Sequence, residues 1–214
     1  MIKLYNDELS GNCYKLRLFM ALLELAYQRV PVNFHPLREH KSEAFLAINP
    51  FGQLPVLDDD GFVLRDAQAI LVYLASRYDA SHAWFPDDPR ARGRIALWLS
   101  VAEDITRTAS AARLHDAFGY PFDVQACRSA AHRLFAHIEE HLSEGEIAQI
   151  HWLAGDRPTI ADIACFPYIA LAPEGGVSLD RYPALRRWIR RVKSLPGFIG
   201  MPGVFAIRID VKSL

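Results

Sequence analysis

Cysteine is scarce in this sequence, and its few positions are scattered. Three cysteines occur among 214 residues, Cys13, Cys127 and Cys165. An odd, widely spaced set of this kind does not predict a disulfide framework. We therefore expect free thiols and a reducing compartment, with the cytoplasm as the default location.

Long apolar runs and an excess of charge of one sign are also missing. No apolar run is long enough to span a bilayer, and the first twelve residues have no apolar signal core. The 24 lysines and arginines nearly balance the 25 aspartates and glutamates, so the net charge is −1. Neither nucleic acid nor a membrane is therefore expected as a partner. With 51% hydrophobic residues, the chain has the composition of a soluble globular protein with one large core or two modest ones.

The most informative stretch of the chain covers residues 48–74. Residues 54–57 (LPVL) predict a brief buried strand, and the proline inside it requires an edge position or a special bend, such as a cis Leu54–Pro55 bond. Residues 58–61 (DDDG) predict a turn, and residues 62–64 the returning strand of a hairpin. Asp66 is a good helix N-cap, and apolar residues recur behind it with helical spacing at Ile70, Leu71, Leu74 and Tyr78.

These elements offer two features that suit a peptide-like ligand. A bend at Pro55 leaves the backbone N–H and C=O of Val56 free to pair with an extended chain. The first turn of the helix behind Asp66 offers unpaired N–H groups and a positive dipole end, which suit a carboxylate. An ordinary strand, hairpin and helix with nothing bound is the alternative interpretation.

The residues before position 79 predict a compact α/β unit. Strands are expected at residues 2–5 and 29–34, the second at a sheet edge because it contains Pro31. Helices are expected from Gly11, with Asn12 as N-cap, and near residues 42–48. Together with the hairpin and the Asp66 helix, this order indicates a four-stranded sheet with helices on both faces.

Residues 79–90 are rich in proline and aspartate and predict a linker, and the chain after them has helical patterns only. Helices are expected over residues 91–118, after residues 119–121, from Thr159 and over residues 182–195. Thr159 and Asp162 have the spacing of a capping box. The predicted organisation is therefore an N-terminal domain at 1–78, the linker, a helical domain at 91–198, and a tail at 199–214 that packs across the surface.

Four segments together resemble the glutathione transferase superfamily, in the order that this superfamily has them. The segments are SGNCYKLRL (10–18), NPFGQLPVL (49–57), LRDAQAILVYL (64–74) and TIADIA (159–164). They are similar to the superfamily's first loop and helix, its cis-proline segment, its γ-glutamyl-binding helix and its helical-domain capping box. The loop combines theta-, zeta- and nu-like features of bacterial cytosolic members.

This resemblance implies a fold, a co-substrate and a reaction. The fold is a thioredoxin-like α/β domain, with a four-stranded mixed sheet and helices, followed by an all-α helical-bundle domain. The reaction is the attack of a glutathione thiolate on a small hydrophobic electrophile bound between the domains, as in detoxification, without a metal. A homodimer is also implied, with the N-terminal unit of one chain against the helical domain of the other.

Three residues are candidates for activating the glutathione thiol, whose pKa when free is about 8.5. A hydroxyl or amide donor at a helix N-terminus stabilises S⁻ more than SH. Ser10 stands where zeta-like members place a catalytic serine, and Asn12 where nu-like members place an asparagine. Cys13, in the first turn of a helix, would instead offer the mixed-disulfide chemistry of omega- and beta-like members.

The resemblance also assigns the glutathione contacts. Val56 is expected to pair with the cysteinyl backbone, Asp66 and Ala67 to meet the γ-glutamyl end, and His40 the glycine carboxylate. The superfamily commonly has serine where this chain has Ala67, so one hydrogen bond worth about 1 kcal/mol is lost unless Gln68 compensates. The full predicted set is His40, Gln53, Leu54, Pro55, Val56, Asp66, Ala67 and Gln68.

The second substrate and the function class are less well determined by the sequence. Candidate electrophile contacts, chosen by location alone, are Arg107, Arg113, His115, Phe118 and Tyr120. A glutathione-dependent disulfide reductase and a non-catalytic binding or regulatory protein remain as alternatives, the latter favoured by Ala67. The HIEEH pattern at residues 137–141 lies in an amphipathic helix and is not taken as a zinc site. The arginines at 186–191 are interpreted as the solvated flank of a helix that buries Trp188.

Overall fold

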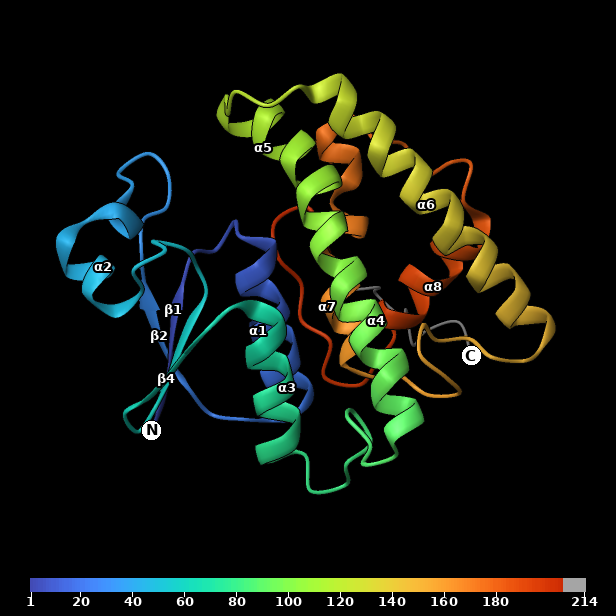
Figure 1. The fold of residues 1–214 in the computed structure, drawn as a ribbon, viewed down its shortest axis with the longest axis horizontal. Coiled ribbons are helices and arrows are strands. Elements are labelled where there is room, and N and C mark those ends of the chain that lie inside the picture. Colours follow the sequence, from blue (N-terminus) through green and yellow to red (C-terminus); the bar gives the residue numbers. More distant parts are fainter. Residues whose placement is uncertain (206–214) are drawn as a thin grey trace, which may run out of the picture.

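A four-stranded mixed sheet forms the N-terminal part of the molecule (Figure 1). Its strands are β1 (Ile2–Asn6), β2 (Gln28–Pro31), β3 (Val56–Asp59) and β4 (Phe62–Arg65), in the spatial order β2-β1-β3-β4. β1 runs parallel to β2 and antiparallel to β3, and β3 and β4 form the predicted hairpin. The structure, a computed structural model, describes residues 1–205, so part of the predicted tail lies outside the described residues.

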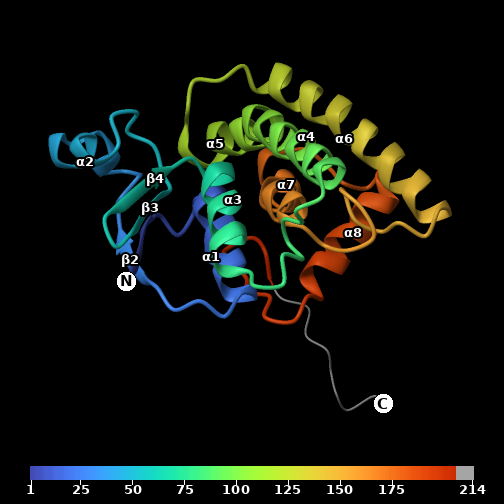
Figure 2. The ribbon, with the colours of Figure 1, turned by 60° about the horizontal axis from the view of Figure 1, so that its bottom comes forward.

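Helices cover both faces of this sheet, as the sequence predicts (Figures 1 and 2). α1 (Gly11–Leu22) and α3 (Ala67–Tyr78) lie on one face, and α2 (Glu43–Ile48) lies on the other. The alternation of β1 explains this arrangement, because successive side chains point to opposite faces. Leu4 joins the main core, whereas Tyr5 packs against a smaller cluster formed with Phe45 and Val56.

Three predictions in this part need correction. β2 ends at Pro31 and is shorter than predicted, although its edge position is confirmed. Pro55 precedes β3, which lies inside the sheet, so the special bend is correct and the edge position is wrong. The Leu54–Pro55 bond is cis, and a second cis bond, His35–Pro36, was not predicted. Ser10, not Asn12, is the N-cap of α1, because its side chain accepts the Cys13 N–H.

The rest of the described chain is helical. Its elements are α4 (Pro89–Ile105), a π-helical segment η2 (Thr106–Ser110), α5 (Ala111–Phe118), α6 (Val124–Ile147), α7 (Ile160–Ala170) and α8 (Pro183–Lys193). Two short 3₁₀ turns are η1 (Glu39–Lys41) and η3 (Ala172–Gly175). α4 begins at Pro89, with Asp88 as N-cap, because proline suits the first position of a helix. The periodicity of residues 91–118 did not predict the π-helical interruption.

Helix α7 is the central element of the helical part, and it packs on α4 and on α1 of the sheet unit (Figure 1). The predicted capping box at its start is confirmed: the Thr159 N–H donates to Asp162 Oδ2 at 2.9 Å. Asp162 also accepts a hydrogen bond from Trp188 Nε1 at 2.8 Å, which ties α8 to α7. The described part of the tail crosses the seam between the two parts, where Ile199 O accepts a hydrogen bond from the Tyr14 hydroxyl at 2.6 Å.

The two patterns that were interpreted without a ligand have structural roles. His141 donates from Nε2 to Leu153 O at 2.9 Å, and its ring packs on Trp98. Arg187 and Arg191 form ion pairs with Glu146, and Trp188 is buried. Within residues 1–205, no group of three metal-binding side chains lies together. No helix over the same residues is long and apolar enough to cross a membrane.

Candidate functional site

A cleft of about 500 Å³ lies where the sheet unit meets the helical part. One wall comes from the β1–α1 loop, the segment before β3 and the start of α3. The other wall comes from α4, η2 and α5, with Tyr168 of α7 at the junction. Its volume falls within the range of small-molecule sites, about 300–1,000 Å³.

Ser10 lies at the point where α1 opens into this cleft. Its Oγ accepts the Cys13 N–H at 3.2 Å, and its hydroxyl proton can be donated either to the Cys13 sulfur or to a ligand in the cleft. Arg17, a buried residue of the next turn, holds the preceding loop by donating to Asp7 O and Glu8 O, both at 3.0 Å. A residue of α1 therefore holds in place the loop that leads to Ser10 at the start of the same helix.

Asn12 also lines the cleft, although it is not a cap. Its backbone N–H donates to the Tyr168 hydroxyl at 3.2 Å. Its side-chain Oδ1 is buried and has no hydrogen-bond partner among the described residues. Asn12 therefore reaches the lining of the cleft with an amide oxygen that the described residues leave unpaired.

Cys13 points away from the cleft, and its burial contradicts the predicted chemistry. Its side chain is completely buried, and its Sγ accepts the Asp7 N–H at 3.5 Å. Burial raises the pKa of the Cys13 thiol to about 11, despite hydrogen bonds that act in the opposite direction. Only a minute fraction is thiolate near neutral pH, so this cysteine is a poor nucleophile.

The cis-proline segment is shaped by Asn49, which is buried. Asn49 Nδ2 donates to Gln53 O at 2.8 Å, and Asn49 Oδ1 accepts the Phe51 N–H at 3.1 Å. Gln53, Leu54 and Pro55 line the cleft.

Val56 does not line the cleft, and the prediction for its backbone is wrong. It begins β3 and is flanked in register by Tyr5 on one side and Arg65 on the other. The residue with free backbone groups is Leu54, whose N–H and C=O have no partner within residues 1–205. The bend at Pro55 therefore leaves unpaired the backbone groups of the residue before it, Leu54, rather than those of the residue after it, Val56.

The start of α3 forms the far end of this wall. Asp66 caps the helix by accepting the Ala69 N–H at 2.9 Å, and its φ of 78° is a strained conformation for a non-glycine residue. The N–H groups of Ala67 and Gln68 have no intrahelical acceptor, as in any first helical turn. Asp66 and Ala67 line the cleft. Gln68 does not line it, but its buried Oε1 has no partner among the described residues.

His40 is not in the cleft, contrary to the prediction. It is buried and stacked on Phe34, with ring centroids 4.0 Å apart. Burial and the neighbouring cations Lys41 and Arg38 lower its pKa, so the ring is neutral near pH 7. The histidine that lines the cleft is His35, which the sequence did not single out.

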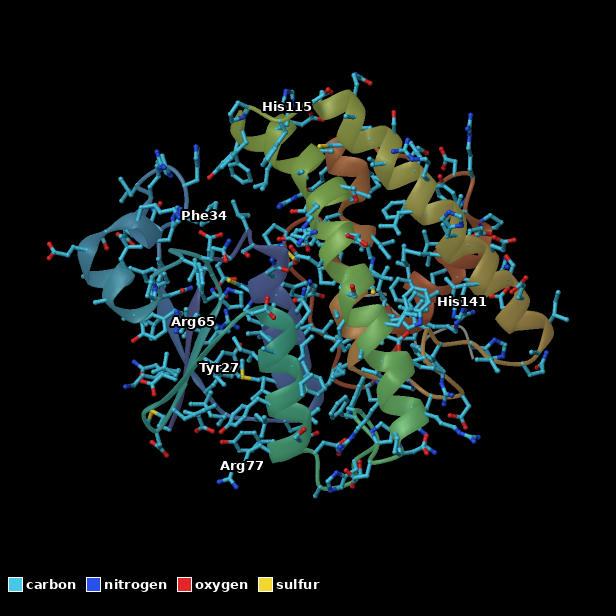
Figure 3. The ribbon with its side chains drawn as sticks, in the orientation of Figure 1. Tyr27, Phe34, Arg65, Arg77, His115 and His141 are labelled. Atoms are coloured by element: carbon cyan, nitrogen blue, oxygen red, sulfur yellow. The ribbon has the colours of Figure 1, made fainter. Side chains whose placement is uncertain are left out.

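Three of the five electrophile candidates line the cleft, namely Arg107, Arg113 and Phe118. Arg107 is exposed and pairs with Glu103 one turn earlier, at 3.2 Å. Arg113 is buried and already bound, to Glu174 at 2.5 Å and to Leu9 O at 3.1 Å, so it joins the two walls. His115 and Tyr120 are not in the lining. Figure 3 shows His115 at the outer end of α5. Its Nδ1 lies 2.9 Å from Asp116 Oδ1.

Several cleft residues have no signal in the sequence. Phe34 comes from the sheet unit (Figure 3), whereas Leu114, Phe118 and Phe122 come from the helical part, and all four line the cleft. Tyr168 is separated from Ser10 by almost the whole chain, and only the fold brings them together. The residues that the sequence did not single out are Asp7, Leu9, Phe34, His35, Glu103, Thr106, Ser110, Ala111, Leu114, Phe122 and Tyr168.

Fold and site together define a class of protein. The mixed sheet with a cis-proline before its third strand is a thioredoxin-like unit, and an all-helical unit completes the cleft. The family model "Glutathione S-transferase, N-terminal domain" matches residues 9–77, and "Glutathione S-transferase, C-terminal domain" matches residues 121–191. The chain belongs to the glutathione S-transferase family.

Individual relatives agree with this assignment. The chain is 32% identical over 205 residues to a maleylacetoacetate isomerase of Pseudomonas aeruginosa, covering 92% of this chain and 93% of the relative. It is 29% identical over 204 residues to glutathione S-transferase GstB of Escherichia coli, and the match covers 92% of this chain and 95% of the relative. A crystal structure of a glutathione S-transferase from Pseudomonas fluorescens superposes with a TM-score of 0.84 at 33% identity, covering 94% and 98%. A crystal structure of a glutathione transferase homologue from Lodderomyces elongisporus, described with two GSH per subunit, superposes with a TM-score of 0.81 at 25% identity. The match covers 92% of this chain and 94% of that chain.

Proposed function

We propose that this protein activates the thiol of glutathione and transfers the thiolate to a small hydrophobic electrophile. The observation that carries this proposal is the position of the Ser10 hydroxyl, which lies at the N-terminus of α1 in a cleft that also holds free backbone groups for a peptide. Family membership supports glutathione transferase activity in general, and the roles below are specific to this chain.

We place glutathione along the sheet-side wall with its γ-glutamyl end at the start of α3 and its glycyl end towards His35. Its γ-glutamyl carboxylate accepts from the Ala67 and Gln68 N–H groups at the positive end of α3, and its ammonium lies near Asp66 and Glu103. Its cysteinyl backbone pairs with the free N–H and C=O of Leu54. The glycyl end then extends past Gln53 towards His35, both of which line the cleft.

In this orientation the sulfur faces Ser10 and Asn12. A hydroxyl hydrogen bond and the α1 dipole both favour S⁻ over SH, so the thiol pKa falls. A reduction of about two units is equivalent to about 3 kcal/mol of differential stabilisation. The thiolate attacks the electrophile, a bond forms from sulfur, and the electrophile's leaving group departs with the electron pair.

The electrophile lies against the helical wall. Phe118 and Phe122, with Leu114, provide an apolar surface for a hydrophobic body. Arg107, the most exposed cation of the lining, and His35 are the groups that can meet negative charge on the electrophile.

Kinetics with two kinds of substrate test this proposal. The purified protein is assayed with glutathione and a halo-arene, and in parallel with a glutathione mixed disulfide. We expect conjugation of the halo-arene, a loss of about 10²-fold in kcat/KM in Ser10→Ala, and little turnover of the disulfide. Efficient disulfide reduction without conjugation would instead indicate the disulfide reductase. Glutathione binding without either reaction would indicate the non-catalytic binding protein that Ala67 favours.

We also propose a homodimer, in which the sheet unit of one chain meets the helical part of the other. Large apolar side chains are exposed on both parts: Phe51 is 69% and Phe62 49% exposed on the sheet unit, and Leu97 is 58% exposed on α4. Burial of such groups is the driving force for association. A cytoplasmic location remains an expectation, to which the three free thiols conform.

A further inference from the structure

We propose that Tyr168 is a second hydroxyl donor to the glutathione sulfur, acting beside Ser10. The inference rests on the proposed function, and it adds a residue of the helical part to a thiolate site otherwise built by the sheet unit. It makes Tyr168 a catalytic residue, because its hydroxyl would touch the reacting atom.

The hydroxyl of Tyr168 lies at the opening of α1. Its Oη accepts the Asn12 N–H at 3.2 Å, and Ser10 Oγ accepts the next N–H, that of Cys13, also at 3.2 Å. Consecutive N–H groups of a first helical turn leave the same end of the helix, so the two hydroxyl oxygens lie beside each other there. Ser10 and Tyr168 both line the cleft, and each hydroxyl keeps one proton to donate.

Gly11 explains how the ring reaches this position. A Cβ at Gly11 would lie 2.5 Å from Tyr168 Cε1, which is closer than side-chain carbons approach. Gly11 is the first residue of a regular helix, so its backbone does not require glycine. The missing side chain instead leaves room for the Tyr168 ring above the first turn of α1.

The surroundings make the phenol a good donor to an anion. Burial raises the pKa of the Tyr168 hydroxyl, so it stays protonated under the conditions in which glutathione is a thiolate. The hydrogen bond accepted from Asn12 polarises its O–H bond, which strengthens donation. The ammonium of Lys15 lies 5.6 Å from the centroid of the same ring, and its positive charge favours an anion nearby.

Ser110 is a second hydroxyl in contact with the Tyr168 side chain, and it is the rival candidate for the donor to sulfur. It is buried in the π-helical segment η2, lines the cleft, and hydrogen-bonds the Tyr168 side chain. π-helical interruptions often occur at functional sites, and this one brings a hydroxyl against the phenol. The Ser110 hydrogen bond lowers the pKa of the Tyr168 hydroxyl, so Ser110 donates to the phenol oxygen and the phenol proton stays available for the sulfur.

The thiol pKa of bound glutathione tests the assignment. The ultraviolet absorbance of the thiolate is titrated with pH in complexes of the wild type, Tyr168→Phe, Ser110→Ala and Tyr14→Phe. Tyr14 is the matched control, because it is also a buried tyrosine of α1–α7 packing, but its hydroxyl donates to Ile199 O outside the cleft. We expect Tyr168→Phe to raise the thiol pKa by about one unit, a tenfold loss of thiolate below the pKa. Tyr14→Phe should leave it unchanged, and any rise in Ser110→Ala should be smaller than that in Tyr168→Phe.

The outcomes separate this inference from the proposed function. A wild-type complex with a lowered thiol pKa that Tyr168→Phe leaves unchanged overturns the inference alone. A rise in Ser110→Ala as large as that in Tyr168→Phe assigns the donor to Ser110 and also overturns it. A wild type that does not bind glutathione overturns both proposals. If Tyr168→Phe does not fold, fluorotyrosine at position 168, a more acidic donor, should lower the thiol pKa, and an unchanged value then overturns the inference.

Discussion

One helical turn contains two side chains that the sequence offers as candidates for the thiol chemistry, and the structure places them in very different surroundings. Ser10 is the cap of α1, so its hydroxyl lies outside the helix and in the cleft. Cys13 is one turn further in, where the core surrounds it and raises the pKa of its thiol to about 11. A shift of three residues along the helix therefore separates a hydroxyl that faces the cleft from a buried, unreactive thiol.

Cys13→Ala should leave thiol transfer almost unchanged. The thiol is absent from the cleft and protonated below about pH 11, so its removal takes away packing but no chemistry. We expect kcat/KM within about twofold of wild type, alongside a lower stability of about 1 kcal/mol for the lost sulfur. Steady-state kinetics and urea unfolding measure the two effects. A large loss of kcat in a folded Cys13→Ala protein would restore the mixed-disulfide mechanism.

Ala67→Ser should strengthen glutathione binding. The added hydroxyl would lie at the start of α3, in the lining of the cleft, and could donate to the γ-glutamyl carboxylate. One hydrogen bond worth about 1 kcal/mol corresponds to about a fivefold lower Kd. Isothermal titration calorimetry checks this value, with Ala69→Ser, on an exposed face of the same helix, as the control. Equal affinities for wild type and Ala67→Ser would place the carboxylate elsewhere.

At the residue scale, motifs located the site better than they identified its side chains. Pro55 and Asp66 are each fixed by a local signal, a proline and a cap, and both line the cleft. Ser10 also lines it, but the sequence indicated Asn12 as the cap, and Ser10 follows only from the family resemblance. The prediction for His40 depends on its spacing from Phe45, and spacing does not reveal which histidine of the loop, His35 or His40, lies in the cleft. Val56 was chosen instead of Leu54 because the sequence does not show that the strand begins after the proline.

Helices α1 and α7 form the packing unit that joins the two parts, and a lysine is buried between them. Lys15 is 0% exposed, its Nζ has no hydrogen-bond partner within residues 1–205, and it lies over the Tyr168 ring. Burial lowers its pKa from 10.5 to about 8, although distant acidic groups act in the opposite direction. An unpaired buried cation of this kind destabilises the fold.

Lys15→Met should stabilise the protein in a pH-dependent way. Below about pH 8 the folded protein must hold the charged amine, which costs up to about 3 kcal/mol relative to the unfolded chain. Between pH 8 and 10.5 the unfolded lysine binds a proton that the folded lysine does not, so wild-type stability rises with pH. The advantage of Lys15→Met should therefore be largest near neutral pH and shrink towards about pH 10. Urea unfolding of both proteins at the two pH values measures it, and a constant difference would contradict the account.

The elements themselves were largely predictable, because each has a periodic apolar face and a recognisable end. Thr159 and Asp162 mark the start of α7 by their capping-box spacing, and the structure contains that capping box. The π-helical segment was not predictable, because an extra residue in one turn scarcely disturbs the apolar pattern of residues 91–118. That segment places Ser110 in the cleft, so the missed detail belongs to the site.

Across the whole molecule, the two parts complete one site. Arg113 of α5 donates to Leu9 O beside Ser10, and Tyr168 of α7 accepts from Asn12, so the helical part holds the first turn of α1 and its loop. The cleft depends on both parts, and its walls have different chemistry: free backbone groups on one side and aromatic rings on the other.

Charge introduced on the exposed apolar surface tests the proposed dimer. Phe51→Glu and Leu97→Glu should each convert a dimeric wild type to monomer in sedimentation velocity, because an unpaired charge would be buried in the contact. Ile147→Glu is the matched control, because Ile147 is 86% exposed at the end of α6, away from the sheet unit. A wild type that sediments as a monomer, or equal effects of all three substitutions, would refute this assembly.

The thiol pKa of glutathione in its complex with this protein is the most direct test of the central proposal. A spectroscopic titration of the wild-type complex should give a value about two units below the free thiol's, and Ser10→Ala should raise it by at least about one unit. A bound thiol that titrates like free glutathione, or a low value that survives in Ser10→Ala, would contradict thiolate activation at the first turn of α1.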